Sequence, residues 1–549
     1  MHFLKKHILA FTILVTTLGI GFIVFGDYGI AWDEPLQRDI GLKSYEYIRG
    51  RDKTLNDFKN RDYGVAVELP LVIMEKALQI KDTRDIFRFR HITMHLFFLL
   101  CAFSFYLLIY YLYRNRLLAL TGYLMLLLSP RIYAQSFYNS KDIPFLCMFI
   151  LSFLTSAIAF RKKKLKYFIL FGIISGLLIN IRIMGIIIPV FTTLMMAIDL
   201  YRQPGKKKII LNYLFYLSLT VGVLYLSWPW LWHDPVGRFS IAFTNMSKFR
   251  WDNPILFMGE LVYASKISWL YFPQWFGFTT PILYLLIGIA GFALLFIKVI
   301  LEPFRFISNT SERNTLLYTG CFLLPVFAVI FLHSVLYDSW RQLYFVYPAF
   351  LLLAIYCLSH IMKFPTSSPL SFRRGAGGEV PLNSKAGGEG LLNSRAGGEL
   401  PRKTTFPRIL FLLVLTGSFA GTLFTMIKSH PFEDVYFNIL LSKDNQYLRK
   451  TFELDYWGTS YKQALEYIVS HDKSTVLNIR VANLPGEHNS MILKPEDRKR
   501  IRYVESDANA DYYITNYRWH PKDYPYPKDK KIFSISVQNS EICTIWKLH

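Results

Sequence analysis

The sequence predicts an all-α polytopic membrane protein with about eleven transmembrane helices, followed by a small α/β domain. Composition is the first reason: 52% of the 549 residues are hydrophobic and only 18% are charged, which is too apolar for an ordinary soluble enzyme. The apolar residues form long runs, and Lys and Arg gather in the loops between them. The net charge of +23 therefore reflects membrane topology, and we expect no nucleic-acid partner.

Eleven apolar runs approach or exceed the length of about 20 residues that crosses a bilayer core as a helix. They cover residues 8–26, 92–113, 117–130, 143–160, 167–181, 184–200, 209–228, 280–300, 315–336, 343–361 and 409–427. The first run follows Lys5 and Lys6, but no small-residue cleavage site comes after it. We therefore expect a membrane anchor there and not a signal peptide.

The basic loops fix the predicted orientation, because Lys and Arg are enriched in cytoplasmic loops. With the N-terminus in the cytoplasm, the basic stretches at 161–166, 202–208 and 298–313 all fall on the cytoplasmic side. Five segments then lie on the opposite, outer face: 27–91, 130–142, 228–279, 337–342 and everything from residue 428. We expect a multi-pass protein of a bacterial inner membrane, with its active site and C-terminal domain on the periplasmic side.

Four domains follow from these runs. Residues 1–361 form the transmembrane module, and 409–427 form the last transmembrane helix. Between them, 362–408 carry a Gly-rich repeat with almost nothing to bury, which predicts a disordered cytoplasmic insert. Residues 428–549 combine a helix near 457–470 with strands near 475–481, 511–515, 531–537 and 541–546. This outer α/β domain suits acceptor recognition or a lid or scaffold role equally well.

An acidic pair follows the first membrane helix directly. Pro35 favours the first turn of a helix, which leaves Asp33 and Glu34 at the N-terminal mouth of that helix. Leu36, Ile40 and Ile48 then mark an apolar stripe, so we expect a helix that lies along the membrane surface. Two interpretations of the acids stand: they cap the helix, or they do chemistry at the membrane surface.

Three charged residues near the bilayer need an explanation. Arg182 lies between the fifth and sixth runs, where an unpaired charge costs about 2.5 to 3.5 kcal/mol, so it pairs with an acid or contacts a lipid phosphate. Asp142 begins the fourth run, where helix capping is sufficient reason for an acid. Lys141 precedes it, and a cation at a helix N-terminus opposes the dipole, which favours a functional role.

The outer loops combine carboxylates with Lys, Arg and many aromatic residues. Cations held beside a membrane suit a phosphate leaving group, and a carboxylate can take a proton from a hydroxyl. Glu68 and Glu260 are further acids in these loops. The five cysteines lie mostly inside apolar runs without close pairing. Neither a disulfide framework nor a zinc ligand set is therefore indicated. We see no compact spacing of metal ligands elsewhere, name no metal-binding residues and expect no cofactor; the sequence does not tell whether a metal is bound.

Together these stretches resemble the membrane glycosyltransferases of the C-type fold (GT-C). The stretches are the acidic pair, Ser129 to Pro144, Trp228 to Pro235, Phe257 to Pro281 and Arg341 to Pro348. The nearest branch is that of the bacterial protein O-mannosyltransferases and aminoarabinose transferases, glycosyltransferase family 39-like. The resemblance covers residues 1–361 and 409–427, and the Gly-rich insert departs from it.

The resemblance implies an inverting transfer of a sugar from a polyprenyl-phosphate donor to a hydroxyl of a protein, lipid or envelope glycan. Asp33 would be the general base, with Glu34 supporting it or orienting substrate. The residues implied in substrate or phosphate binding are Lys141, Asp142, Arg182, Arg341, Glu68 and Glu260. The sequence indicates neither the sugar nor the acceptor.

Two other function classes fit a charged helical bundle. A transporter or flippase for a lipid-linked or anionic substrate would also need many helices and charges facing a cavity. Such proteins usually show internal repeats with paired broken helices, and we find no such symmetry in the sequence. An inactive scaffold that binds polyprenyl phosphate is the third possibility.

Overall fold

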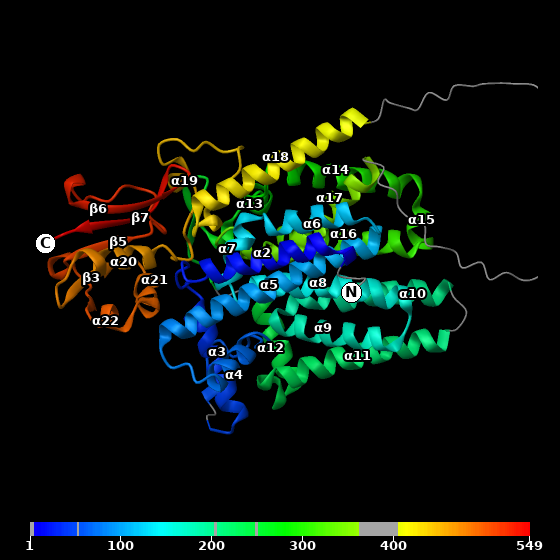
Figure 1. Ribbon diagram of the computed structural model, residues 1–549. Coiled ribbons are helices and arrows are strands. Elements are labelled where there is room, and N and C mark those ends of the chain that lie inside the picture. Colours follow the sequence, from blue (N-terminus) through cyan, green and yellow to red (C-terminus); the bar gives the residue numbers. More distant parts are fainter. Residues whose placement is uncertain (1–4, 52–53, 203–205, 248–250, 362–404) are drawn as a thin grey trace, which may run out of the picture.

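The computed structural model describes residues 5–51, 54–202, 206–247, 251–361 and 405–549 of the chain. It is a bundle of apolar helices with a mixed α/β domain at one end (Figure 1). Most of the predicted Gly-rich insert, residues 362–404, lies outside the described residues.

Eight helices of the described chain are long and apolar enough to cross a membrane. They are α5 (Thr83–Tyr113), α8 (Asp142–Lys162), α10 (Ile187–Arg202) with the turn before it, α11 (Lys206–Ser227), α14 (Ile282–Leu301), α16 (Thr310–Phe331), α17 (Tyr347–Ile361) with the turn before it, and α18 (Thr405–Ser429). This is a multi-pass membrane protein, as the sequence predicts.

The predicted count of eleven spans is not confirmed. Two of the predicted spans, α2 (Ile8–Val24) and α9 (Leu165–Ile181), have 17 residues each. The predicted run at 117–130 is a pair of shorter helices, α6 (Arg116–Leu127) and α7 (Pro130–Tyr138), bent by 64°. Pro130 starts the second of them and lacks the N–H that would continue the first. If this pair is one span, the described residues hold up to nine long spans.

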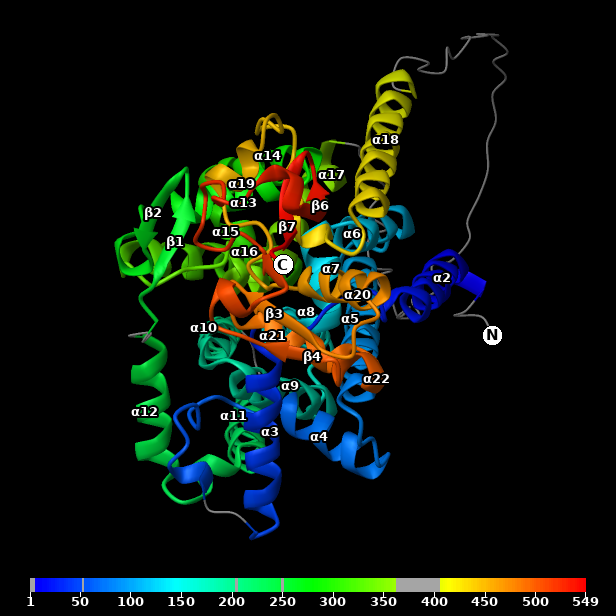
Figure 2. The same cartoon turned by 90° about the vertical axis from the view of Figure 1, so that its left-hand side faces the viewer.

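The predicted surface helices of the first outer loop are present. α3 (Glu34–Ile48) and α4 (Glu68–Ala77) pack against each other at the end of the bundle that carries the C-terminal domain (Figures 1 and 2). The helix α12 (Pro235–Ser247) stands apart from them in Figure 2. Of the predicted stripe on α3, Ile40 is buried while Leu36 and Ile48 are exposed. The stripe is therefore divided between contact with the protein and an open face.

Shorter elements complete the end of the bundle that carries the C-terminal domain. They are the antiparallel hairpin of β1 (Pro254–Phe257) and β2 (Glu260–Tyr263), and the helices α13 (Tyr271–Thr279) and α19 (Tyr447–Thr451). At the other end of the bundle lies the short helix α15 (Pro303–Ser308) (Figure 1).

The C-terminal domain contains a five-stranded sheet in the order β4-β3-β5-β7-β6. Its strands are β3 (Leu477–Val481), β4 (Ile501–Tyr503), β5 (Tyr512–Thr515), β6 (Lys531–Val537) and β7 (Ser540–Lys547), with β3 parallel to β4 and β5 and the other pairs antiparallel. The helix α20 (Tyr461–His471) covers the sheet, and α21 (Pro485–His488) and α22 (Pro495–Arg498) follow β3 and precede β4. Tyr461, Leu465 and Ile468 are buried in the same apolar core as strand residues such as Ile514. The helix, the strands and the fold class predicted here are confirmed.

Helix α8 separates the two charged ends of the bundle. It begins at Asp142 and ends at Lys162, next to the basic stretch 161–166. Twenty-one helical residues span about 30 Å. Any group that contacts Asp142 therefore lies a membrane thickness away from those basic residues.

Candidate active site

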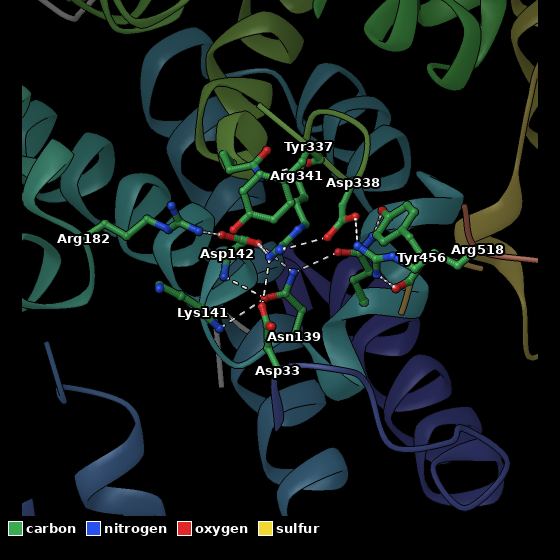
Figure 3. A network of polar contacts seen from close by, with 12 residues as sticks. Asp33, Asn139, Lys141, Asp142, Arg182, Tyr337, Asp338, Arg341, Tyr456 and Arg518 are labelled. Atoms are coloured by element: carbon green, nitrogen blue, oxygen red, sulfur yellow. Dashed lines mark hydrogen bonds and ion pairs between the residues drawn. The ribbon is translucent and has the colours of Figure 1, made fainter. Parts of the chain in front are cut away.

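Asp33 stands at the N-cap position of α3, and its side chain makes no capping hydrogen bond. The carboxylate instead lies 3.3 Å from Nη1 of Arg341 and is 33% exposed, whereas the Arg341 side chain is only 4% exposed. Capping alone therefore does not account for this acid. Asp33 is the solvent-accessible member of a charged cluster at the end of the bundle that carries the C-terminal domain (Figure 3).

Arg341 lies at the centre of this cluster. Its Nη1 also lies 3.3 Å from Asp142, and its Nη2 donates to Asp338 at 3.1 Å. The guanidinium centre lies 4.5 Å from the Trp457 ring and 4.9 Å from the Tyr337 ring. A planar guanidinium suits such a site, because its fork can serve several carboxylates while its faces rest on aromatic rings.

Asp142 joins Arg341 to Arg182, with which it forms a buried ion pair. It does not cap α8, as helix position alone would suggest. The N-cap residue is Lys141, and Asn139 Oδ1 accepts the N–H groups of Lys141 and Asp142 at 3.2 and 2.8 Å. The Asp142 carboxylate is thereby free to hold two arginines from other elements, one at the end of α9 and one before α17.

Lys141 is the cation of the cluster without an ion pair among the described residues. Its Nζ lies 3.5 Å from the centre of the Tyr63 ring. Burial, together with the nearby Arg182, lowers the pKa of Lys141 to about 7. An anion that approaches Lys141 would stabilise its charged form and raise its pKa again.

Two further donors in the cluster are open. Nε of Arg182 and Nε of Arg341 are buried and have no hydrogen-bond partner among the described residues. Buried donors are rarely left unpaired, because each one costs about 1 to 3 kcal/mol. Together with Lys141, they give the cluster unused capacity to bind an anion.

A cavity of about 190 Å³ adjoins the cluster, lined by Lys59, Asn60, Asp62, Tyr63, Asn245, Met246 and Trp251. Two of the lining residues contact residues of the cluster. Nζ of Lys141 lies over the Tyr63 ring, and Trp251 stacks on Tyr337 with ring centres 4.1 Å apart. The lining mixes aromatic faces with amide and carboxylate groups, a composition suited to a polar ring-shaped ligand.

Glu34 points away from Asp33. It is buried, its Oε2 accepts the Ala31 N–H at 2.8 Å, and its Oε1 lies 3.0 Å from Nε2 of His91. Successive residues of a helix point about 100° apart, so the two acids face different surroundings. Glu34 anchors the start of α3, next to Asp33.

Glu68 and Glu260 lie outside the cluster. Glu68 is buried in an ion pair with Arg90, which also pairs with Glu75 at 2.9 Å, and it accepts a hydrogen bond from Ser140, the neighbour of Lys141. Glu260 is an exposed residue at the start of β2. The structure thus brings together Asp33, Lys141, Asp142, Arg182 and Arg341, and leaves Glu34, Glu68 and Glu260 apart from them.

Sequence reasoning missed Arg518 and Trp457. Arg518 Nη2 donates to Asp338 at 2.7 Å, and Trp457 covers Arg341. No local pattern marks Arg518, which follows a strand in the C-terminal domain. In the described part of the chain, no group of three or more His, Cys, Asp or Glu side chains could hold a metal ion.

Comparison with known proteins gives one family match. A family model described as dolichyl-phosphate-mannose-protein mannosyltransferase matches residues 79–233, a stretch that contains Lys141, Asp142 and Arg182. The resemblance to polyprenyl-phosphate-dependent membrane glycosyltransferases is confirmed over this stretch. None of the curated proteins matches the chain.

Several solved structures are similar over most of the chain. The oligosaccharyltransferase of Archaeoglobus fulgidus in its apo form is 10% identical, with a TM-score of 0.48, covering 92% of this chain and 69% of that one. ArnT from Cupriavidus metallidurans bound to undecaprenyl phosphate is 11% identical, with a TM-score of 0.47 and coverage of 99% and 98%. The arabinofuranosyltransferase AftD from Mycobacteria is 10% identical, with a TM-score of 0.41 and coverage of 97% and 40%.

Proposed function

We propose that this chain is an inverting glycosyltransferase, which moves a sugar from a polyprenyl-phosphate donor to a hydroxyl acceptor at the non-cytoplasmic face of its membrane. The observation that carries the proposal is the meeting of one accessible carboxylate, Asp33, with three basic side chains, Lys141, Arg182 and Arg341. The family match over residues 79–233 supports it, because the description of that family names a lipid-phosphate sugar donor.

The roles follow from the chemistry of a direct displacement. Asp33 accepts the proton of the acceptor hydroxyl as the hydroxyl oxygen attacks the anomeric carbon of the sugar. The bond from that carbon to the phosphate oxygen breaks, and the departing phosphate takes the electron pair. Arg341, Lys141 and the open Nε of Arg182 stabilise the negative charge that develops on the phosphate.

Asp142, Glu34 and Glu68 take supporting roles, and Glu260 takes none. Asp142 holds Arg182 and Arg341 in place, and Glu34 holds the Ala31 N–H at the start of α3, so both fix the geometry of the charged groups. Glu68 orients Ser140, beside Lys141. The donor sugar would occupy the cavity between Tyr63 and Trp251, with the lipid tail in the bilayer. Because Asp142 and the basic stretch 161–166 lie at opposite ends of α8, the site falls on the non-cytoplasmic side by the positive-inside rule.

The test uses the full chain in lipid nanodiscs with synthetic undecaprenyl-phosphoryl mannose and undecaprenyl-phosphoryl aminoarabinose, and with membranes of the producing cells as acceptor. We expect one donor to be consumed with release of undecaprenyl phosphate. Asp33→Asn should slow this release about 10²- to 10⁴-fold, the usual contribution of a general base, while binding of undecaprenyl phosphate is kept.

The matched control is Asp39→Asn, which removes an acid from the same helix without touching the cluster. Release should continue at the native rate in this variant. Native-rate release by Asp33→Asn would refute the assignment of the base, and failure of the native chain to bind undecaprenyl phosphate would refute the proposed function as a whole.

A further inference from the structure

The C-terminal domain forms hydrogen bonds with the backbone of the short segment that leads from α2 to Asp33. Asn489, next to α21, makes two hydrogen bonds to Ile30: its Nδ2 donates to the carbonyl oxygen at 3.0 Å, and its Oδ1 accepts the N–H at 2.8 Å. The Trp32 N–H donates to the Trp457 carbonyl at 2.9 Å. The backbone at Ile30 and Trp32 is thus hydrogen-bonded to the C-terminal domain, and Trp32 directly precedes Asp33.

Two further contacts hold the same segment against the C-terminal domain. Nζ of Lys462 donates to the Gly26 carbonyl at 2.7 Å. A Cβ atom on Gly29 would lie 2.2 Å from the Thr459 carbonyl oxygen, so only glycine allows the two backbones to approach this far. Every contact here involves the backbone of the 26–32 segment, which therefore has its path set by the domain.

The same domain also reaches Arg341. Asp338 is shared between two arginines: its Oδ2 accepts from Arg341 at 3.1 Å, and its Oδ1 accepts from Arg518 at 2.7 Å. Arg518 in turn donates to the Tyr456 carbonyl and rests 4.7 Å from the Trp32 ring. Figure 3 shows Arg518, Asp338 and Arg341 in line toward Asp33 and Asp142.

We propose, on the basis of the proposed function, that residues of the C-terminal domain hold the active-site groups in position. Asn489 is a positioning residue for Asp33, and Arg518 is a positioning residue for Arg341 through Asp338. Arg518 neutralises one oxygen of Asp338, which leaves Arg341 with capacity for the donor phosphate. Without Arg518, Asp338 would draw Arg341 to itself.

Simple docking of the domain is the competing explanation, and the chain offers a matched control for it. Nη2 of Arg498, in α22, donates to Asp82, the N-cap of α5, at 2.8 Å. This is also an arginine–aspartate pair between the C-terminal domain and the bundle, but it contacts neither the 26–32 segment nor the cluster. If docking were all that mattered, losing Arg498 and losing Arg518 would have similar effects.

The first experiment measures binding of undecaprenyl phosphate to the full chain in nanodiscs. We expect Arg518→Ala to raise the Kd about tenfold, a coupling of about 1.4 kcal/mol. In an Asp338→Asn background the same change should alter the Kd less than about twofold, because no carboxylate remains to redirect Arg341. The double variant also removes the buried Asp338 carboxylate that Arg518→Ala alone would leave with one arginine in place of two, so it keeps the comparison valid if Arg518→Ala alone folds poorly.

The second experiment separates Asn489 from Arg518. Asn489→Ala should lower the rate of donor consumption about tenfold with the Kd for undecaprenyl phosphate unchanged, because it loosens Asp33 and leaves Arg341 in place. Arg498→Ala should change neither quantity. Thermal unfolding of each variant reports whether the domain remains folded.

The outcomes are distinguishable. A native chain that neither binds undecaprenyl phosphate nor consumes donor overturns the proposed function. A native chain that does both, together with an Arg518→Ala variant that binds equally well or an effect that persists in the Asp338→Asn background, overturns the positioning role while the proposed function stands. Equal losses in Arg498→Ala and Arg518→Ala would show that docking alone matters.

Discussion

Binding of a lipid phosphate should weaken as pH rises through neutrality, because Lys141 loses its proton there. Burial is the chief cause that lowers the pKa of Lys141 to about 7. A phosphate beside the ammonium favours the charged form and raises this pKa in the complex. Protonated Lys141 is thus the binding-competent form, and high pH removes it.

The size of the effect follows from the pKa. At pH 6 about nine in ten Lys141 side chains carry the proton, and at pH 8 about one in ten. The Kd for undecaprenyl phosphate should therefore rise about tenfold between pH 6 and pH 8, or about 1.4 kcal/mol.

The same residue also affects folding: between pH 7 and its ordinary value of 10.5, the unfolded chain binds a proton that the folded chain does not. The contribution of Lys141 to the free energy of unfolding therefore increases with pH across this window.

The assay is a titration of undecaprenyl phosphate into nanodiscs at half-unit steps of pH, with Lys141→Arg as the reference. Arginine stays charged throughout and can still rest on the Tyr63 ring. The phosphate of the probe titrates as well, but equally for both proteins, so the ratio of the two Kd values isolates Lys141. A ratio that stays constant from pH 6 to pH 8 would show that Lys141 does not contact the phosphate as a cation.

Three other substitutions test neighbouring parts of the structure. Arg341→Lys keeps a charge but loses the fork that joins Asp33, Asp142 and Asp338, so donor consumption should fall about 10- to 100-fold, and a native rate would remove Arg341 from the mechanism. Glu68→Gln breaks a buried ion pair with Arg90 and should lower the free energy of unfolding by about 3 kcal/mol in a denaturant titration; unchanged stability would mean that Arg90 is satisfied by Glu75. Glu260→Gln alters an exposed side chain and should change stability by less than about 0.5 kcal/mol and donor consumption not at all, whereas a slower rate would place Glu260 at the substrate.

The acidic pair illustrates what local pattern can and cannot predict. Pro35 and the end of the first apolar run locate the start of α3, and the structure begins that helix at Glu34. The pattern does not distinguish the two acids, because both suit a helix N-terminus. Their surroundings distinguish them: Glu34 contacts the Ala31 N–H and His91, while Asp33 contacts Arg341, which is 308 residues away in the sequence.

Asp142 and Glu260 illustrate the same limit in opposite directions. Helix capping was enough to explain Asp142 from its position in the sequence. In the structure, however, the Asn139 side chain accepts the Asp142 N–H, and the Asp142 carboxylate holds two arginines. Glu260 belongs to a loop that carries other acids, yet the hairpin of β1 and β2 turns it toward solvent. Loop membership places a residue on one face of the membrane, but the contacts of its side chain depend on how the loop folds.

The sequence by itself determined the membrane class, the apolar segments, the α/β nature of the C-terminal domain and the cations and acids available to a site. These properties depend on composition and on periodicities within one segment, which a single stretch of chain carries. Only the tertiary structure decided which charges meet. Arg518 reaches Asp338 across 180 residues and Asn489 reaches Ile30 across 459, and such pairings arise from packing between elements, which leaves no signal in either local sequence.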